Sequence, residues 1–365
     1  MSNKRICLVI PSLQAGGMER VMSELAAIFS AKPNVEVHLI LYGITREMFF
    51  SVPDNITIHK PAFEFNNKKR FFSTVKTLFF LRKKVKQLGP DTLLSFGEYW
   101  NNFFLLSLLG LNYKTYVSDR SQPDKSLGKL HDALRHWLYP KATGVILQTE
   151  RGKDIFLKHT LHDNIAVIGN PIREIKMAEP ELQRDKVVVM VGRLIKSKNQ
   201  DRLIQIFAKI ANPDWKLMLV GYDHLKQNNM DRLKQLASDL NIAEQVIFTG
   251  KQNNIDEILN KSSIFAFTSS SEGFPNVIGE AMSSGLPVIA YDCNAGPAEM
   301  INDGNNGFLI PLFNDDLFET NLSKLMDDAT MRAEFGVQGQ SDIKAFSKEH
   351  IGERFYNFIT QKHNR

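Results

Sequence analysis

Short, unbroken apolar runs alternate with helical patterns along nearly the whole chain, and this alternation restricts the fold more than any other feature. Residues 187–191, V-V-V-M-V, are apolar at every position, as expected of a strand buried on both faces of a parallel sheet. Strands and helices that alternate in this way predict doubly wound α/β sheets. The other predicted strands are 6–10, 35–41, 92–96, 115–118, 145–148, 215–220, 246–249, 264–268 and 287–290.

The length predicts two such domains. A chain of 365 residues, 43% hydrophobic and 23% charged, exceeds the usual size of a single core and can build two. The segment 171–184 contains two prolines and no apolar period, so we expect it to link a domain over 1–170 to a domain over 185–347. Because parallel sheets bind ligands at the carboxyl ends of their strands, facing domains predict one ligand cleft between them.

The most specific stretch runs over residues 268–307 and begins T-S-S-S-E-G-F-P-N-V-I-G-E. Pro275 fits a first helical turn, and Gly285 fits a left-handed stop after a helix over 276–284. The first amides of that helix, those of Asn276, Val277 and Ile278, are expected to point toward an oxygen-rich ligand. Glu272 precedes the helix and Glu280 lies within it. Taken alone, two carboxylates at this spacing favour solvated helix charges over a binding site, and it is the surrounding turn, proline and glycine that favour a site.

Two further loops follow predicted strands and carry residues suited to phosphate. After residues 187–191 comes Gly192-Arg193, with Lys198 five positions later; together their charges can offset that of a diphosphate. After residues 6–10 comes Gly16-Gly17, which allows close backbone approach to a phosphate but is by itself a common turn. Glu19 and Arg20, which follow, equally fit ordinary first-turn charges.

Taken together, these segments resemble the retaining glycosyltransferases of family 4, which have the GT-B fold of two Rossmann-like domains. The 272–280 block carries most of the resemblance, and the fit extends over nearly the whole chain. By resemblance the last helix, 348–365, packs back on the first domain, and packing on its own domain is the alternative. The resemblance implies Glu272, Arg193 and Lys198 as catalytic residues, and as donor-binding residues Gly16, Gly17, Gly192, Gly250, Lys251, Gly273, Phe274, Pro275, Asn276, Val277 and Glu280.

The acceptor side departs from the family pattern. Many relatives have a Glu-His or Glu-Arg pair after the strand that corresponds to residues 115–118, where this chain has Asp119-Arg120. A histidine role is therefore not available here. We expect Asp119, Arg120 and Glu98 to lie on the acceptor side, and Arg120 equally fits a surface charge at a strand end.

Positive charge is concentrated in the first half of the chain. Residues 1–180 contain 25 Lys and Arg against 16 Asp and Glu, whereas the remainder has 20 against 24. The segment 66–88 has eight basic residues and no acidic one, with Phe71, Phe72 and Phe79 among them. This basic amphipathic helix fits an anionic membrane surface, where each basic residue adds roughly 1 kcal/mol, and a core-packed helix with a solvated edge fits equally well.

The sequence disfavours several other classes of function and location. No nucleic-acid motif occurs, so nucleic acid is not an expected partner. Metal-ligand spacings such as Asp-x-Asp or His-Glu-x-x-His are absent from the sequence, so we expect no cofactor and no metal. No apolar run is long enough for a signal peptide or a membrane span. Cys7 and Cys293 give no disulfide framework, which suits the cytoplasm, with peripheral contact to the inner face of the cell membrane.

The resulting prediction is a metal-independent, retaining hexosyltransferase. The resemblance implies transfer of a sugar from a nucleotide-diphosphate donor to a lipid-linked oligosaccharide of O-antigen, capsule or exopolysaccharide. A UDP-sugar is the favoured donor. Two alternatives remain: a sugar-nucleotide epimerase on the same fold, which needs no acceptor, and a noncatalytic membrane-associated binding protein.

Overall fold

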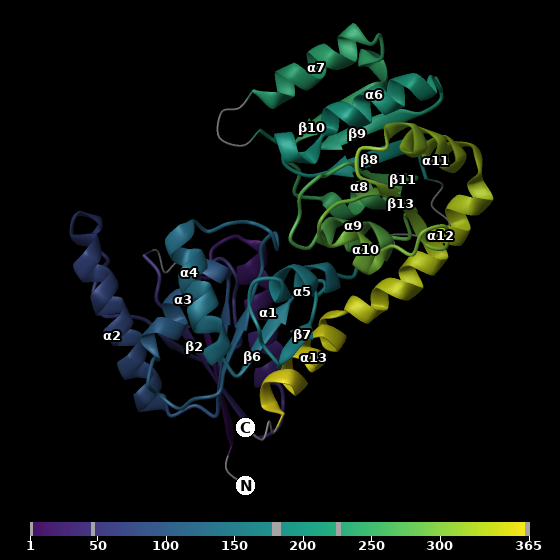
Figure 1. Cartoon of the computed structure of the whole chain (residues 1–365). Coiled ribbons are helices and arrows are strands. Elements are labelled where there is room, and N and C mark those ends of the chain that lie inside the picture. Colours follow the sequence, from purple (N-terminus) through teal and green to yellow (C-terminus); the bar gives the residue numbers. More distant parts are fainter. Residues whose placement is uncertain (1–2, 45–47, 177–183, 224–227, 362–365) are drawn as a thin grey trace. The chain divides into compact units, whose positions relative to one another are not determined.

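The computed structural model describes residues 3–44, 48–176, 184–223 and 228–361, and the chain divides into two compact units (Figure 1). Unit 1 comprises Met1–Pro171 together with Lys348–Arg365, and unit 2 comprises Ile172–Ser347. Each unit contains one parallel sheet with helices packed against it. The predicted fold class of two doubly wound α/β domains is therefore confirmed.

Within the described residues, the sheet of unit 1 has seven strands in the order β3-β2-β1-β4-β5-β6-β7, and every neighbouring pair is parallel. The connections therefore diverge between β1 and β4, and the loops that leave these two strands border the switch point of the sheet. The strands are β1 (Lys4–Ile10), β2 (Val35–Leu41), β3 (Thr57–His59), β4 (Thr92–Phe96), β5 (Thr115–Ser118), β6 (Gly144–Leu147) and β7 (Ile165–Val167).

Helices of unit 1 connect these strands, and the last one comes from the far end of the chain. Helix α13 packs on α1, where Gly352 lies directly against Ile28, and its Phe355 ring is 5.9 Å from the ring of Phe96. The predicted terminal helix thus belongs to unit 1 as far as Thr360; residues 362–365 lie outside the described residues. The helices are α1 (Gly17–Ser30), α2 (Arg70–Leu88), α3 (Glu98–Ser107), α4 (Lys129–Leu138), α5 (Glu150–Leu157) and α13 (Lys348–Thr360).

The described part of unit 2 holds a six-stranded parallel sheet in the order β10-β9-β8-β11-β12-β13, which places its switch point between β8 and β11. The strands are β8 (Val187–Val191), β9 (Lys216–Val220), β10 (Val246–Gly250), β11 (Ile264–Phe267), β12 (Val288–Asp292) and β13 (Gly307–Pro311). The helices are α6 (Gln200–Ile210), α7 (Asn229–Asp239), α8 (Ile255–Lys261), α9 (Asn276–Ser283), α10 (Pro297–Met300), α11 (Asp315–Asp327) and α12 (Ala329–Asp342).

Both faces of the unit 2 sheet are buried, which explains the unbroken apolar runs. Along β8, Val188 and Met190 belong to one hydrophobic cluster, while Val187 and Val189 belong to the cluster on the opposite face. Alternate strand residues point to opposite faces, so a strand covered on both sides is apolar at every position.

The junction between the units differs from the predicted linker over 171–184. Ile172 and Ile175 are 6% and 2% exposed and lie in the core of unit 2. Each of these isoleucines packs singly and lies outside any strand or helix. The sequence around them therefore shows no apolar period, and the prediction assigned them to the linker. Residues 177–183 lie outside the described residues.

Candidate functional site

The predicted donor residues of unit 2 come from loops on either side of its switch point. Arg193 and Lys198 follow β8, and Glu272 follows the neighbouring strand β11. Crevices at the carboxyl ends of such strands are the usual ligand sites of doubly wound sheets. The order of the strands therefore gathers these loops at one edge of the sheet.

Lys198 and Glu272 form an ion pair at this edge, in which Nζ of Lys198 donates to Oε1 of Glu272. Both side chains are only 14% exposed, and the ammonium group lies 5.0 Å above the centre of the Phe267 ring. Contact with this ring face also favours the cation. The pairing of residues 74 positions apart places a cation and a carboxylate side by side at the end of the sheet.

Hydroxyl and amide side chains join the two loops that carry this pair. Thr268 Oγ1 donates to the carbonyls of Lys198 (3.0 Å) and Asn199 (3.1 Å), and Asn199 Nδ2 donates to the Thr268 carbonyl at 2.9 Å. The backbone N–H and Oγ of Ser270 both donate to the Ser197 carbonyl, at 2.8 and 3.2 Å. No role was predicted for these residues, although the run T-S-S-S at the end of a predicted strand is a signal that could have pointed to them. They fix Lys198 relative to Glu272.

The start of α9 differs in detail from the prediction. Two of the three amides expected to face a ligand are used internally, because Asn276 N–H donates to Phe274 O and Ile278 N–H donates to Pro275 O, each at 3.0 Å. Within the described residues, Val277 is the one of the three whose amide makes no backbone hydrogen bond. The first turn is wound tightly, so the helix offers fewer donors than an open N-terminus.

Glycines keep the rest of this edge closely packed. A Cβ on Gly221 would lie 1.9 Å from the Gly192 carbonyl oxygen, and one on Gly296, whose φ is +103°, would lie 2.0 Å from Pro275 Cδ. Gly285 has the predicted left-handed conformation, with φ +75°. Close backbone contacts of this kind allow only glycine.

Other predicted donor residues contact groups other than Lys198 and Glu272. Glu280 on α9 faces Arg173, with 3.8 Å between Oε1 and Nε. The Phe274 side chain is buried in the core and lies against Phe346, so its contribution is packing. Arg193 and Lys251 are exposed. Gly273 lies in the turn before α9, and Gly250 ends β10 with φ +68°.

In unit 1, the glycine loop lies between β1 and α1, on one side of the switch point. Gly16 precedes the first turn of α1 and Gly17 begins it. The carboxylate of Glu19 folds back over Gly16, where an added Cβ would lie 2.2 Å from its Oε2. Burial raises the pKa of Glu19. In this structure the Glu19 carboxylate thus covers Gly16.

Glu98 and Arg120 lie on the other side of this switch point. Glu98 is 8% exposed, and its Oε1 accepts hydrogen bonds from the backbone N–H groups of Arg120 (2.9 Å) and Ser121 (2.8 Å). The Arg120 guanidinium lies 4.5 Å above the Phe96 ring and donates to Asn170 Oδ1. Burial lowers the pKa of Arg120 to about 9. Glu98 therefore fixes the loop on which Arg120 is held.

Asp119 points into unit 1 and has buried partners. It is paired with Arg135, and its Oδ1 accepts from the Tyr139 hydroxyl at 2.5 Å and from Asn101 Nδ2 at 3.4 Å. Burial raises the pKa of Asp119 to about 6, against the opposing effect of Arg135. This carboxylate thus holds the ends of β5, α3 and α4 together.

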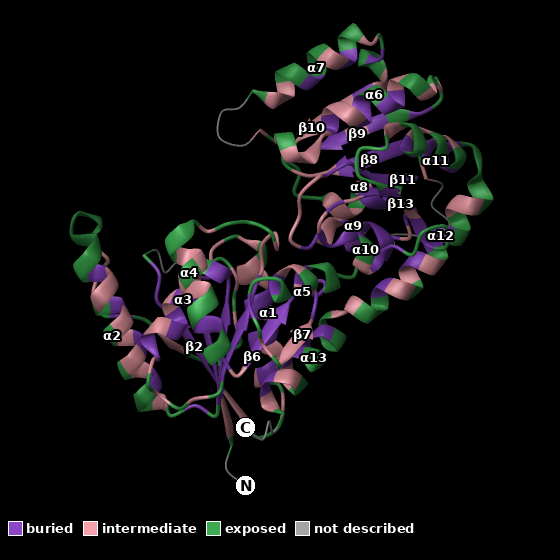
Figure 2. Ribbon diagram, in the orientation of Figure 1, coloured by how far each residue is buried: buried purple, intermediate pink, exposed green. Residues whose placement is uncertain are grey.

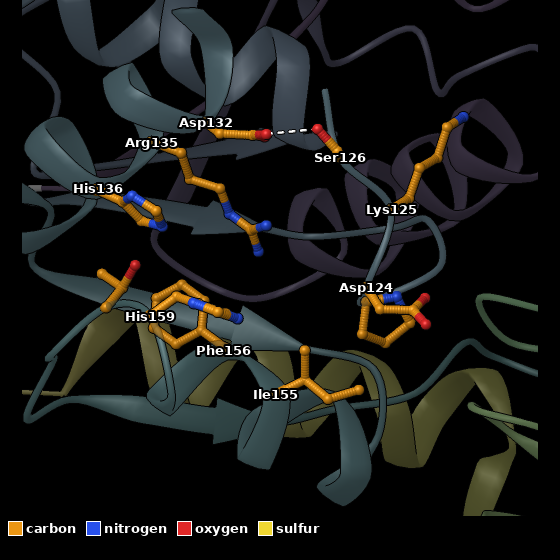
Figure 3. A pocket seen from close by; sticks show the side chains of 11 residues that line it. Asp124, Lys125, Ser126, Asp132, Arg135, His136, Ile155, Phe156 and His159 are labelled. Carbon is orange, nitrogen blue, oxygen red and sulfur yellow. Dashed lines mark hydrogen bonds between the residues drawn. The ribbon is translucent and has the colours of Figure 1, made fainter. Parts of the chain in front are cut away.

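Arg135 also borders a pocket of about 230 Å³ between α4, α5 and the loop after β5 (Figure 3). The rings of His136 and His159 stack at 6.1 Å on one side of it. Ser126, in the loop after β5, donates at 2.5 Å to Asp132, which lies on α4 one helical turn before His136. In the described residues, no group of three or more His, Cys, Asp or Glu side chains is arranged to hold a metal ion. None of the described helices is both long and apolar enough to cross a membrane.

Comparison with known proteins identifies relatives of the whole chain. The family model "Glycosyl transferases group 1" matches residues 172–342. An uncharacterised glycosyltransferase of Haemophilus influenzae is 32% identical over 302 residues, covering 81% of this chain and 82% of that protein.

A second relative has a more specific name, the N-acetylgalactosamine-N,N'-diacetylbacillosaminyl-diphospho-undecaprenol 4-alpha-N-acetylgalactosaminyltransferase of Campylobacter jejuni. It is 28% identical over 373 residues, covering 98% of this chain and 99% of that protein. Among solved structures, a lipopolysaccharide outer core galactosyltransferase in its apo form superposes with a TM-score of 0.82, at 22% identity, over 97% of this chain and 99% of that one. The structural likeness shows a shared GT-B fold.

Proposed function

Because this chain belongs to the glycosyl transferases group 1 family, we propose that it transfers a sugar, with retention, from a nucleotide-diphosphate donor to a lipid-linked saccharide of a bacterial surface polysaccharide. The observation that carries the proposal is the Lys198–Glu272 pair at the switch point of unit 2. The full-length relative from Campylobacter, whose name specifies an undecaprenol-linked substrate, supports the choice of acceptor.

Lys198 supplies the positive charge that this reaction needs. As the bond to the donor sugar breaks, negative charge builds on the departing diphosphate, and a fixed cation lowers the energy of that state. Lys198 is held in place by Glu272, Phe267 and the backbone hydrogen bonds of its loop, so little reorganisation is needed. Arg193, exposed on the same loop, adds a second charge that can reach the diphosphate. With both cations in place, the proposed chemistry is metal-independent.

Glu272 has two consecutive tasks in this proposal. Without donor it neutralises Lys198, which lowers the cost of keeping this mostly buried cation at the site. When the diphosphate takes over Lys198, the carboxylate is released to accept hydrogen bonds from the hydroxyls of the donor sugar. Glu280, on α9, is proposed to bind the ribose.

The test is nucleotide release from a panel of UDP-, GDP- and ADP-sugars, UDP-sugars first, with and without undecaprenyl-diphosphate-linked saccharides. We expect one nucleotide to be released only when acceptor is present, at a rate that EDTA leaves within about twofold. The anomeric configuration of the product, read by NMR, then checks retention. Conversion of the sugar nucleotide without acceptor would instead favour the epimerase, and binding without turnover would favour a noncatalytic protein.

We further propose that α2 holds the enzyme at the inner face of the cell membrane. Three phenylalanines of this helix, Phe71, Phe72 and Phe79, are exposed by 75%, 67% and 67%, and Figure 2 shows that most of α2 is exposed or half-buried. Lys76 and Lys83, also exposed, lie on the same helical stripe as Phe72 and Phe79. The helix does pack on the core, through Ser73, Thr77, Leu81 and Val85, so the core-packed alternative holds for that face, while these three rings lie outside it.

This membrane proposal makes a separate prediction. In vesicle co-sedimentation, Phe72→Ser with Phe79→Ser should lower the affinity for anionic phosphatidylglycerol vesicles by about tenfold or more, because two aromatic rings no longer enter the lipid. Binding of the wild type should also weaken as salt rises. Phe313→Ser, an exposed ring of unit 2, is the matched control. Equal binding by the double variant and the wild type would contradict the proposal.

A further inference from the structure

An aromatic pocket of about 120 Å³ lies in unit 1, between α2, the loop after β2 and the start of α3. One wall comes from the loop after β2, with Tyr42, and another from the start of α3, with Tyr99, Trp100 and Phe103. Both loops leave the carboxyl edge of the sheet, on either side of β1, whose own loop carries Gly16 and Gly17. The pocket therefore opens at the edge of unit 1 that carries the acceptor-side residues.

The rings of this pocket are arranged by contacts with one another. Tyr42 stacks on Phe103 with centroids 5.6 Å apart and meets Trp100 edge-on at 6.0 Å. Trp100 in turn meets Tyr99 edge-on at 5.2 Å. Such an array is rigid and presents flat ring faces to an occupant.

The Tyr42 hydroxyl is the unusual group. Tyr42 is 2% exposed, and its hydroxyl has no hydrogen-bond partner within the described residues. Burial raises the pKa of this hydroxyl, so it stays protonated and able to donate. A buried hydroxyl without a partner costs about 1–3 kcal/mol, a cost that a ligand could remove by accepting its hydrogen.

The opposite wall is the polar face of α2. Arg70, Thr74 and Thr77 recur at helical spacing along it, and each threonine hydroxyl donates to a carbonyl of its own helix at 2.8 Å. Each threonine oxygen thus keeps a lone pair for a ligand donor. The pocket offers aromatic faces together with hydrogen-bond donors and acceptors.

We propose that this pocket is a subsite for one sugar residue of the acceptor saccharide, an inference that rests on the proposed transferase function. A pyranose has electron-poor C–H groups that suit aromatic faces and hydroxyls that pair with Tyr42, Thr74 and Thr77. A lipid chain would leave the Tyr42 hydroxyl unpaired, and a phosphate alone would make no use of the rings. A sugar satisfies both sets of groups.

The test uses the full chain and soluble methyl glycosides of glucose, galactose, N-acetylglucosamine and N-acetylgalactosamine, without donor. We expect ligand-detected NMR to find one glycoside that binds the wild type. Tyr42→Phe should weaken its binding about tenfold, the effect of one hydrogen bond, while the unfolding midpoint stays the same or rises. Trp100→Leu, which removes a wall, should abolish the binding.

Tyr356→Phe, on α13 against Phe29, is the matched control and should bind like the wild type. Glycoside binding that Tyr42→Phe leaves unchanged would overturn the subsite, and so would saturable binding of farnesyl phosphate with no glycoside binding. Because no donor is present, this result is independent of turnover. Tyr42-dependent binding without nucleotide release from any donor would instead sink the transferase proposal and leave a saccharide-binding pocket.

Discussion

Replacing Lys198 with alanine is expected to lower turnover by about 10²–10³-fold, the effect of removing one fixed donor from a site where negative charge develops. The loss should appear in kcat as well as in kcat/KM, because the diphosphate carries more charge in the transition state than in the bound donor. Acceptor-dependent nucleotide release measures it.

Stability should change much less. The loop that carries Lys198 is held by its backbone carbonyls, which accept hydrogen bonds from Thr268, Ser269 and Ser270 after β11. None of these hydrogen bonds involves the lysine side chain. The variant leaves Glu272 without its cation, but the side chain is not fully buried, and removing the lysine side chain beside it exposes the carboxylate further to water. We expect the unfolding midpoint to fall by a few degrees at most.

Lys196 provides the matched control. It lies two residues earlier in the same short 3-10 turn and is exposed, so Lys196→Ala changes the charge of the loop without touching Glu272. Its turnover should stay within about twofold of the wild type. Glu272→Ala should behave like Lys198→Ala. Full turnover by a well-folded Lys198→Ala protein would show that the diphosphate is neutralised elsewhere.

Strands buried on both faces were the easiest elements to predict. The bounds predicted for β2, β4, β5 and β8 agree with the structure. Three of these strands, β4, β5 and β8, are largely buried and end directly before Gly97, Asp119 and Gly192, which mark their ends in the sequence. The short strands β3, β7 and β13 were not among the predicted ones; β3 and β7 have three residues each and no buried position. A strand of this kind leaves no periodic signal in the sequence.

The candidate site could be predicted as a set of loops but not as a set of contacts. The sequence placed Lys198 and Glu272 after two predicted strands, yet their ion pair depends on β8 and β11 being neighbours, and this order could not be read from the sequence. For helix α2 the predicted element was correct, but the face that it buries was not. Its phenylalanines predicted an apolar face, whereas the protein buries Ser73 and Thr77 and exposes the rings, since the helical period locates a face without saying what covers it.

Replacing Arg135 with methionine is expected to destabilise unit 1 by about 3–5 kcal/mol at about pH 8, because it leaves the buried carboxylate of Asp119 without its cation. Methionine is chosen because it keeps an apolar stem beside the rings of Tyr139 and Phe156, which the guanidinium contacts at 5.3 and 5.4 Å. The measured loss then reports mainly on charge. Thermal unfolding of variant and wild type measures it.

The stability lost on replacing Arg135 should be larger at high pH than at low pH. The pKa of Asp119 is raised to about 6 in the folded protein from 3.8, so the folded state binds this proton more tightly than the unfolded chain does, and stability falls as pH rises between these values. Arg135 opposes that shift, so the methionine variant should raise the pKa further and extend the fall to higher pH. Toward about pH 5 the carboxyl is protonated in both proteins, and the difference between them should shrink.

A second substitution separates charge from packing. Asp119→Asn added to Arg135→Met removes the carboxylate that lost its partner and should recover most of the lost stability at about pH 8, because the amide carries no charge and can still accept from Tyr139. The nearby Glu98 also raises the pKa of Asp119, and since it is present in every variant its effect cancels in the comparison. An equal loss at about pH 8 and pH 5 would mean that Arg135 stabilises unit 1 by packing, and that Asp119 does not need its charge.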